Sequence, residues 1–212
     1  MPPRAKICGL STPETIDAAV RHGASHIGLM FFAPSPRHLG FADASRLSAL
    51  IPGHVARVGV FVDPDDALID QAIAAGGLTV LQLHSTAPAR AAALGARTGL
   101  EIWSAVAVRE RRDLDAAASY VGAADRILYD AKTPDGALLP GGMGVRFDWE
   151  LLRGFAHPLP WALSGGLTAD NVGAAVAATG ASLVDASSGL ETAPGIKDVD
   201  KIAAFLQALS HL

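Results

Sequence analysis

Short runs of β-forming residues alternate with Ala- and Leu-rich amphipathic stretches along the whole of this 212-residue chain. Runs such as residues 58–62 contain no polar side chain, which is typical of parallel strands covered by helices on both faces. This simple alternation limits the chain to a parallel α/β fold. Eight strands are predicted, at residues 4–8, 26–31, 55–62, 78–83, 101–106, 126–129, 160–163 and 182–185. Helices are predicted at residues 13–22, 42–50, 65–75, 87–96, 110–118, 169–178 and 198–209.

The connection after the sixth predicted strand lacks a helical pattern over residues 131–147. Its strings Thr133-Pro134-Asp135-Gly136 and Pro140-Gly141-Gly142-Met143-Gly144 are typical of loops. A loop of this length in a compact domain is usually functional or disordered. Only a short helix, near residues 148–152, is predicted after it.

Two glycine-centred turns follow the seventh and eighth predicted strands, at Leu163–Leu167 and Ser187–Leu190. Glycine permits positive φ and close approach of the backbone, so consecutive N–H groups can converge on an anion. Helical patterns follow both turns, and helix N-termini add partial positive charge. The two turns therefore predict one phosphate site, formed by Gly165, Gly166, Ser187, Ser188 and Gly189.

The place of these turns distinguishes between the two common parallel α/β folds. A dinucleotide-binding sheet carries a glycine-rich fingerprint after its first strand, but Cys8-Gly9-Leu10 has none. Phosphate sites after strands 7 and 8 are typical of (β/α)8 barrels. We therefore predict a single (β/α)8 TIM barrel over residues 1–212, with a phosphate site after its last two strands.

Composition excludes several classes of protein. Half of the residues are hydrophobic and 18% are charged, which argues against disorder. The net charge is -4 with no basic stripe, so no nucleic-acid partner is predicted. One cysteine and scattered histidines predict no disulfide and no metal site. There is no apolar leader and no span of membrane length, so we expect a cytoplasmic protein without membrane contact.

Two ionisable residues end predicted strands at the rim where barrel active sites lie. Cys8 ends the first strand and is either a small buried residue or a base or nucleophile with a lowered pKa. Asp130 ends the sixth strand and is either an ordinary turn residue or a proton donor facing Cys8 from the opposite side of the cavity. To donate at neutral pH, Asp130 needs a pKa raised by burial or by nearby negative charge.

Three further polar residues are candidates for ligand binding. Arg37 lies in a loop stiffened by Pro34 and Pro36, which suits a bidentate grip on a carboxylate, although a solvated surface arginine is the alternative. His84 ends the fourth strand and suits a neutral hydrogen-bonding role or a place at the rim. Asp185 precedes the second turn, and we interpret it as a partner that holds that turn in place.

Twelve short strings occur in order along nearly the whole chain: Lys6-Ile7-Cys8-Gly9-Leu10, Phe31-Phe32, Ser35-Pro36-Arg37, Val60-Phe61-Val62, Leu81-Gln82-Leu83-His84, Leu128-Tyr129-Asp130, Gly141-Gly142-Met143-Gly144, Phe147-Asp148-Trp149, Leu163-Ser164-Gly165-Gly166-Leu167, Asn171-Val172, Val184-Asp185-Ala186-Ser187-Ser188-Gly189-Leu190-Glu191 and Pro194-Gly195-Ile196-Lys197-Asp198. Taken in this order, these motifs resemble the phosphoribosylanthranilate isomerases, barrel enzymes of tryptophan biosynthesis. The chain departs from the usual pattern at Ser85, Met143, Ser164 and Ala186, none of which is a predicted catalytic group.

The resemblance implies an Amadori rearrangement of N-(5-phosphoribosyl)anthranilate to the corresponding 1-deoxyribulose 5-phosphate. By analogy, Asp130 is the general acid, Cys8 the general base, and Arg37 the partner of the anthranilate carboxylate. No cofactor is implied, because the nitrogen of the substrate acts as the electron sink. The expected partner is this small phosphoribosyl substrate, bound by a monomer or a homodimer.

Three alternatives remain at this stage. The related isomerase of histidine biosynthesis resembles a duplicated half-barrel with two phosphate grips and an aspartate on strand 1, where this chain has Cys8. An indole-glycerol-phosphate synthase type of lyase needs a catalytic lysine near the strand ends, and Lys6 precedes the rim. The third alternative is a binding module for a phosphorylated metabolite without catalysis.

Overall fold

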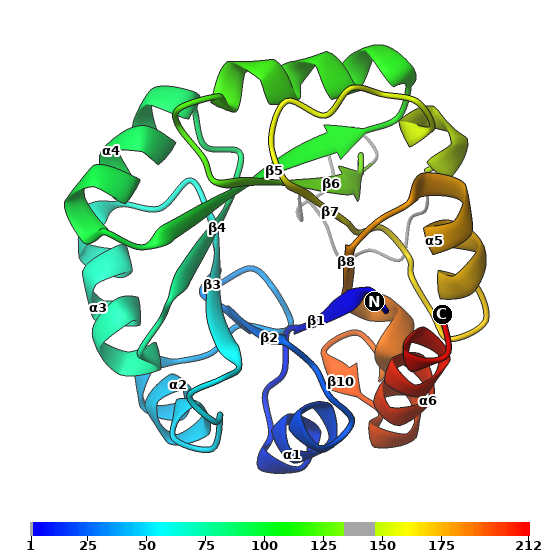
Figure 1. The fold of residues 1–212 in the computed structure, drawn as a ribbon. Helices are drawn as coiled ribbons and strands as arrows, with labels where there is room; N and C mark the ends of the chain where they lie inside the picture. The colour runs from blue at the N-terminus through cyan, green and yellow to red at the C-terminus, as the bar shows by residue number, and fades with distance from the viewer. Residues whose placement is uncertain (1, 134–146) are drawn as a thin grey trace.

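Eight parallel strands close into a barrel in the computed structural model, which describes residues 2–133 and 147–212 (Figure 1). The strands follow one another in sequence order, and β8 pairs with β1, with Arg4 opposite Leu183 and Lys6 opposite Asp185. The predicted fold class is confirmed. The strands are β1 (Arg4–Cys8), β2 (His26–Met30), β3 (Ala56–Val62), β4 (Val80–His84), β5 (Glu101–Val108), β6 (Arg126–Ala131), β7 (Trp161–Leu163) and β8 (Leu183–Ala186).

Helices form a ring outside the strands, as the view along the barrel shows (Figure 1). Local sequence accounts for their ends: Thr12 accepts a hydrogen bond from the N–H of Thr15 at the start of the first helix, and Pro13 fits its first position. The α-helices are α1 (Pro13–Arg21), α2 (Phe41–Ser48), α3 (Asp66–Gly76), α4 (Pro88–Thr98), α5 (Val172–Thr179) and α6 (Val199–Ser210).

The helical ring departs from the sequence prediction in two places. The segment after β5 is a 3-10 helix, η1 (Arg111–Tyr120), instead of an α-helix over 110–118. The predicted start of the seventh helix at residue 169 is three residues early, because residues 164–171 form a turn that leads to α5. The predicted short helix is η2 (Trp149–Leu152). Of the predicted loop 131–147, residues 134–146 lie outside the described part of the chain.

The second glycine turn is also followed by an element that the sequence did not predict. A short 3-10 helix, η3 (Ser188–Leu190), leads into an antiparallel hairpin of β9 (Glu191–Ala193) and β10 (Ile196–Lys197), and only then does α6 begin. The helix predicted over residues 198–209 is α6 (Val199–Ser210), and the hairpin lies between it and the second turn. The hairpin brings two ionisable residues, Glu191 and Lys197, to the carboxyl end of the barrel.

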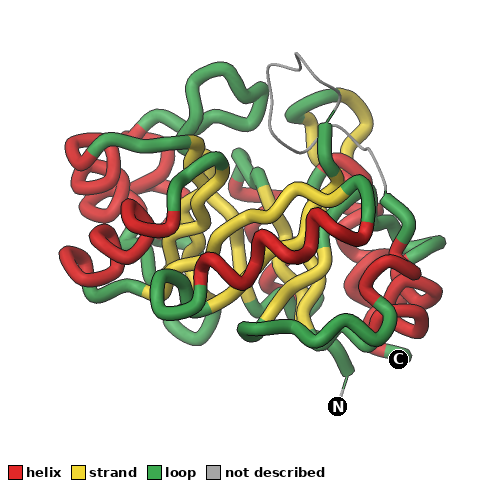
Figure 2. Tube along the Cα trace, turned by 90° about the horizontal axis from the view of Figure 1, so that it is seen from above, coloured by secondary structure: helices red, strands yellow, loops and turns green. Residues whose placement is uncertain are grey.

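The barrel interior is filled with side chains and is not a pore. At the amino end of the strands Trp103 is fully buried, with His26 at 5.2 Å between ring centroids and the Arg126 guanidinium 5.3 Å from its ring. Above it, small and branched interior residues complete the core, so the ionisable groups gather at the carboxyl end. Seen from the side, both termini lie at one end of the barrel (Figure 2). Within the described residues, no helix has the length and apolar character to cross a membrane.

Candidate active site

The first ionisable pair of the site comes from the two strands that close the barrel. Lys6 is fully buried on β1, and its Nζ lies 2.8 Å from Oδ1 of Asp185 on β8. Burial opposes the charged form of Lys6, but the Asp185 carboxylate and Cys8 raise its pKa above the ordinary value. Asp185 therefore contacts a strand residue, a partner that the sequence analysis did not foresee. Lys6 itself is a site residue that the sequence reasoning set aside.

Cys8 ends β1 and lies on the same side of the strand as Lys6, because alternate strand residues share a face. Only 4% of Cys8 is exposed, and burial raises the pKa of its thiol, an effect that Lys6 opposes and Asp185 reinforces. The lowered pKa that the sequence analysis required of a base at Cys8 is therefore not found in the free protein, because burial outweighs the charge of Lys6. Gly28 on the neighbouring β2 makes this arrangement possible. A Cβ at position 28 would lie 2.8 Å from the Cys8 Sγ and 3.2 Å from the Lys6 Cε.

Asp130 occupies the corresponding place near the end of β6, with 7% of the residue exposed. Its Oδ1 accepts a hydrogen bond from the N–H of Ala131 at 2.9 Å. Burial, and then the nearby Asp185 carboxylate, raise its pKa to about 6, although Ala131, Ser164 and Lys6 act in the opposite direction. A carboxyl group with this pKa is protonated in about a tenth of the molecules at pH 7, far more than at its ordinary pKa, which favours a role as a general acid.

The order of strands gives the relative places of the acid and the base. β6, β7, β8 and β1 are consecutive around the barrel, so Asp130 lies three strands from Cys8. The strand directly opposite β1 in a ring of eight is β5, so the sequence reasoning was wrong to place Asp130 opposite the first strand. Asp185 on β8 lies between the two groups, and its charge acts on both.

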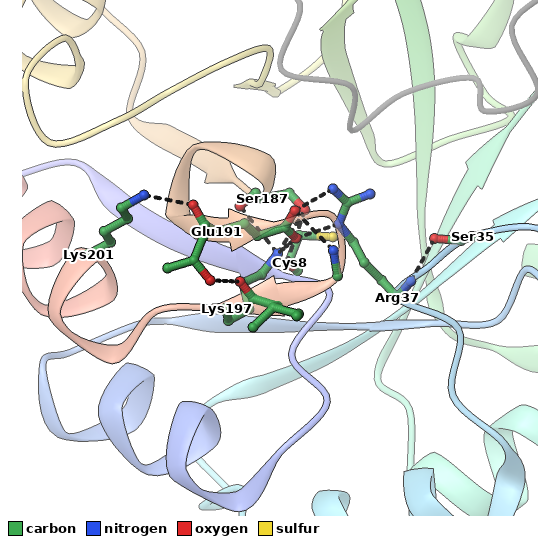
Figure 3. Close-up of polar contacts among 10 residues, drawn as sticks. Cys8, Ser35, Arg37, Ser187, Glu191, Lys197 and Lys201 are labelled. Atoms are coloured by element: carbon green, nitrogen blue, oxygen red, sulfur yellow. Dashed lines mark hydrogen bonds and ion pairs between the residues drawn. The ribbon is translucent and has the colours of Figure 1, made fainter.

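Arg37 is not a solvated surface residue, since only 4% of its side chain is exposed. Its guanidinium grips Glu191 in a bidentate pair, with Nε to Oε1 at 2.7 Å and Nη2 to Oε2 at 2.8 Å (Figure 3). Glu191 also pairs with Lys197. Burial would raise the pKa of Glu191, but the hydrogen bonds from Arg37 and Lys197 hold it below its usual value. The residues of the β9–β10 hairpin thus fix the direction of Arg37.

The backbone explains why the loop of Arg37 and the hairpin come so close. Gly195 has a φ of 83°, and a Cβ there would lie 2.5 Å from the carbonyl oxygen of Pro36. A Cβ at Gly9 would lie 2.6 Å from the Cδ of Arg37. Glycine at these two positions lets the loop pack against the hairpin on one side and against the end of β1 on the other.

His84 ends β4 and is buried, with its Nε2 at 2.9 Å from the Nε2 of Gln82. Burial, with a contribution from the Lys6 charge, lowers the pKa of His84 to about 4, so its imidazole is neutral near pH 7. This agrees with a neutral hydrogen-bonding role. Gln82 lies two residues earlier on the same face and was not predicted as a site residue.

The two glycine turns pack against each other beside these groups. Gly165 and Gly166 have φ of 93° and 65°, and Asn171 closes their turn by donating to the Gly166 carbonyl at 3.0 Å. A Cβ at Gly189 in the second turn would lie 2.1 Å from the carbonyl oxygen of Leu167 in the first. The backbones of the two turns thus lie side by side, as the two halves of a phosphate site would require.

Ser187 connects the second turn to Cys8 and to the hairpin. Its hydroxyl donates to the carbonyl oxygen of Cys8 at 3.2 Å, and Lys197 Nζ donates to its carbonyl oxygen at 3.2 Å (Figure 3). Ser188 begins η3 and is partly exposed. A lysine next to the predicted phosphate turn was not foreseen, because Lys197 is separated from Ser187 by the whole hairpin.

The fold and the site define a (β/α)8-barrel protein whose ionisable groups gather where the active sites of barrel enzymes lie. The family model described as N-(5'phosphoribosyl)anthranilate (PRA) isomerase matches residues 5–208. An N-(5'-phosphoribosyl)anthranilate isomerase of Zymomonas mobilis subsp. pomaceae is 56% identical over 211 residues, covering 99% of both chains. One of Paramagnetospirillum magneticum is 49% identical, covering 98% of this chain and 97% of the relative.

Solved structures agree with this comparison. The crystal structure of phosphoribosyl anthranilate isomerase from Thermotoga maritima has a TM-score of 0.88 at 34% identity, covering 99% of each chain. A structure of such an isomerase in complex with reduced 1-(o-carboxyphenylamino)-1-deoxyribulose 5-phosphate has a TM-score of 0.85 at 32% identity, with the same coverage. This chain belongs to the phosphoribosylanthranilate isomerase family.

Proposed function

We propose that this chain catalyses the Amadori rearrangement of N-(5-phosphoribosyl)anthranilate to 1-(2-carboxyphenylamino)-1-deoxyribulose 5-phosphate in tryptophan biosynthesis. Asp130 is the general acid and Cys8 the general base. The observation that carries the acid role is the burial of Asp130 at the carboxyl end of β6, which raises its pKa to about 6. The base role is supported by the place of Cys8 at the carboxyl end of β1, where the Lys6 charge favours the thiolate against the effect of burial. Membership of the isomerase family supports the reaction itself.

The reaction requires two proton transfers to reach an enolamine, a tautomerisation in which C1 gains a proton and the C2 hydroxyl loses one, and no net oxidation. Asp130 donates its proton to the ribose ring oxygen, the bond from that oxygen to C1 breaks, and a protonated imine forms between C1 and the anthranilate nitrogen. Cys8 as thiolate then removes the proton from C2, and the electron pair of that bond forms an enolamine as the imine nitrogen is neutralised. Tautomerisation of the enolamine gives the C2 ketone. The cationic imine makes the C2 proton acidic enough for a thiolate base.

Binding groups surround this pair of residues. Arg37 receives the anthranilate carboxylate, and its grip on Glu191 gives the guanidinium a fixed direction before the substrate arrives. The backbone of the two turns, with Gly165, Gly166, Ser187, Ser188 and Gly189, binds the phosphate. The phosphate contributes binding energy away from the reacting carbons, which positions them between acid and base.

His84 contributes as a neutral hydrogen-bonding group, because its lowered pKa keeps its imidazole uncharged. We further infer that the whole chain acts as one catalytic domain in the cytoplasm, as a monomer or a homodimer. A phosphoribosylanthranilate isomerase of known structure, from Thermotoga maritima, is described as dimeric, which makes the oligomeric state of this chain worth measuring.

The test is a fluorescence assay for loss of N-(5-phosphoribosyl)anthranilate with the purified chain and two variants. We expect Cys8→Ser and Asp130→Asn each to lower kcat by at least about a hundredfold, the usual effect of removing a general acid or base. Substrate binding should change less, because neither group supplies the main contacts to phosphate or carboxylate.

Asp63→Asn is the matched control, because it removes a carboxylate just beyond the carboxyl end of β3, at the same end of the barrel. Asp63 has a φ of 41°, a conformation that asparagine tolerates well. We expect the control variant to keep its rate. A wild-type rate in either test variant would remove the role assigned to that residue, and no turnover by the unmodified chain would contradict the reaction.

A further inference from the structure

A buried ion pair, Lys6 with Asp185, lies in the site and has no part in the two proton transfers. The two residues face each other in the register of β1 and β8, with Nζ 2.8 Å from Oδ1. Lys6 is fully buried and Asp185 is 5% exposed. Buried ion pairs often contribute little net stability, because the cost of removing both charges from water offsets their attraction. Closure of the barrel alone is therefore a weak reason for placing these two charges here.

The ammonium group of the pair acts on Cys8. Lys6 and Cys8 lie on one face of β1, and the Sγ and the Lys6 Cε share the niche left by Gly28. The Lys6 charge favours the ionised form of Cys8. A positive charge nearby favours a thiolate over a thiol. The other charges that act on Cys8 are Lys197, which also favours the thiolate, and Asp185, which opposes it.

The carboxylate of the pair acts on Asp130. Asp185 on β8 and Asp130 on β6 lie on the two strands that flank β7, and Ser164 directly follows β7. A negative charge nearby disfavours ionisation of a second carboxyl group. After burial, Asp185 is the strongest influence that keeps the proton on Asp130, while Lys6, Ser164 and the Ala131 N–H act against it.

We propose that Lys6 and Asp185 are positioning residues that assign opposite proton states to the two catalytic groups, with Lys6 supporting the Cys8 thiolate and Asp185 keeping Asp130 protonated. This inference rests on the roles of Cys8 and Asp130 proposed above. A base must be unprotonated and an acid protonated at one pH. An ion pair with its positive end toward the base and its negative end toward the acid favours both states together.

The experiment titrates Cys8 in the free protein, without substrate. Cys8 is the only cysteine of the chain, so the ultraviolet absorbance of the thiolate reports this one group once the titration of Cys8→Ser is subtracted. The variants are Lys6→Met, Asp185→Asn and the double variant. Lys201→Met is the control, because it removes the same charge from α6, where Lys201 is exposed and binds the carbonyl oxygen of Glu191.

We expect the two single variants to shift the pKa of Cys8 in opposite directions. Loss of Lys6 should raise it by at least about 1 pH unit, a roughly tenfold smaller thiolate fraction at a fixed pH below the pKa. Loss of Asp185 should lower it. Shifts of the Cys8 pKa in the same direction, or shifts no larger than that of the control, would overturn the proposal. General damage to the site would not raise the pKa of Cys8 in one variant and lower it in the other.

Lys6→Met leaves a buried carboxylate without its partner and can fail to fold. The double variant removes both charges, and its comparison with Asp185→Asn isolates the effect of Lys6. The Cys8 pKa should be higher in the double variant than in Asp185→Asn, and equal values would overturn the proposal. The pKa of Asp130 can be measured by carbon NMR, with its signal assigned by comparison with Asp130→Asn. This pKa should rise when Lys6 is replaced and fall when Asp185 is replaced.

These titrations are independent of turnover. If the ion pair shifts both groups as expected but Cys8→Ser or Asp130→Asn retains full activity, the proposed catalytic roles fail and the electrostatic link remains. If the shifts are absent but both catalytic variants are inactive, the catalytic roles remain and the inference about Lys6 and Asp185 is wrong.

Discussion

At the scale of single residues, Cys8, His84 and Asp130 are held in buried environments that oppose their charged forms. Asp130 is the clearest case, because a carboxyl group with 7% exposure has a pKa of about 6. Its folded-state pKa lies above the unfolded value of about 3.8. The folded protein therefore binds this proton more tightly than the unfolded chain does. Stability from this proton is present at low pH and is lost as the pH rises through about 6.

Asp130→Asn should therefore stabilise the fold at neutral and higher pH while lowering kcat as predicted above. At pH 8 the difference in pKa corresponds to a gain on the order of 3 kcal/mol, since each pH unit is worth about 1.4 kcal/mol. The gain should shrink steeply toward pH 4, where the native carboxyl group is protonated. Urea unfolding of the unmodified protein and of Asp130→Asn between about pH 4 and pH 8 measures this difference in the free energy of unfolding. A stability difference independent of pH would contradict the raised pKa.

The residue scale also shows where sequence reasoning failed. Cys8 and Asp130 could be found because each ends a recognisable strand, and strand ends are where barrel sites lie. Lys6 was set aside for preceding the rim, although its spacing of two from Cys8 already placed both side chains on one face. The pairing of Arg37 with Glu191 had no local signal, because 154 residues separate them and only the closed fold brings them together.

At the scale of elements, the unpredicted β9–β10 hairpin is the part of the structure that positions Arg37. Eight strands and six helices could be recognised from their periodicity, with ends that differ by a few residues from the structure. The hairpin could not be recognised in this way, because β10 has only two residues and the alternation of a strand becomes visible only over a longer run. η1 was predicted as an α-helix because the two helix types share the same amphipathic spacing over a few turns.

Gly195→Ala should disturb this hairpin and through it the substrate carboxylate. The new Cβ would lie 2.5 Å from the Pro36 carbonyl oxygen, at a φ of 83° that disfavours alanine. We expect the loop of Arg37 to move, so that KM rises several-fold while kcat changes little. Steady-state kinetics separate the two parameters.

Gly53→Ala is the control for this change, because no atom lies within 4 Å of the Cβ position and its φ is not in the left-handed region. A normal KM for Gly195→Ala would show that the hairpin does not position Arg37. A fall in kcat with no change in KM would show that its effect lies in the chemical step instead.

At the scale of the whole molecule, every strand of the barrel is hydrogen-bonded to two neighbours, since β8 returns to β1. No strand can separate from the barrel without breaking its backbone hydrogen bonds to two neighbouring strands. The fully buried core residues, among them Trp103 inside the barrel and Phe205 on α6, extend from the interior to the outer helices. This continuity favours unfolding as one cooperative unit, in agreement with the proposed single domain.

Urea unfolding followed by tryptophan fluorescence and by far-ultraviolet circular dichroism should therefore give coincident transitions. The three tryptophans lie on β5, η2 and β7, whereas circular dichroism reports all helices. Phe205→Ala on α6 should shift both transitions equally, by about 3–5 kcal/mol for a fully buried phenylalanine. Separate transitions, or a shift seen by only one probe, would contradict a single cooperative unit.

The contact of Lys6 with Asp185 spans 179 residues, and this separation matters during synthesis on the ribosome. β1 emerges before β8, and until β8 follows, the lysine and thiol of β1 have neither the carboxylate nor the second neighbouring strand that will cover them. Both arrive only with β8. A nascent chain can therefore form most of its strand pairs while it has no functional site. When β8 emerges, it closes the barrel over Lys6 and Cys8 and supplies Asp185 at the same time.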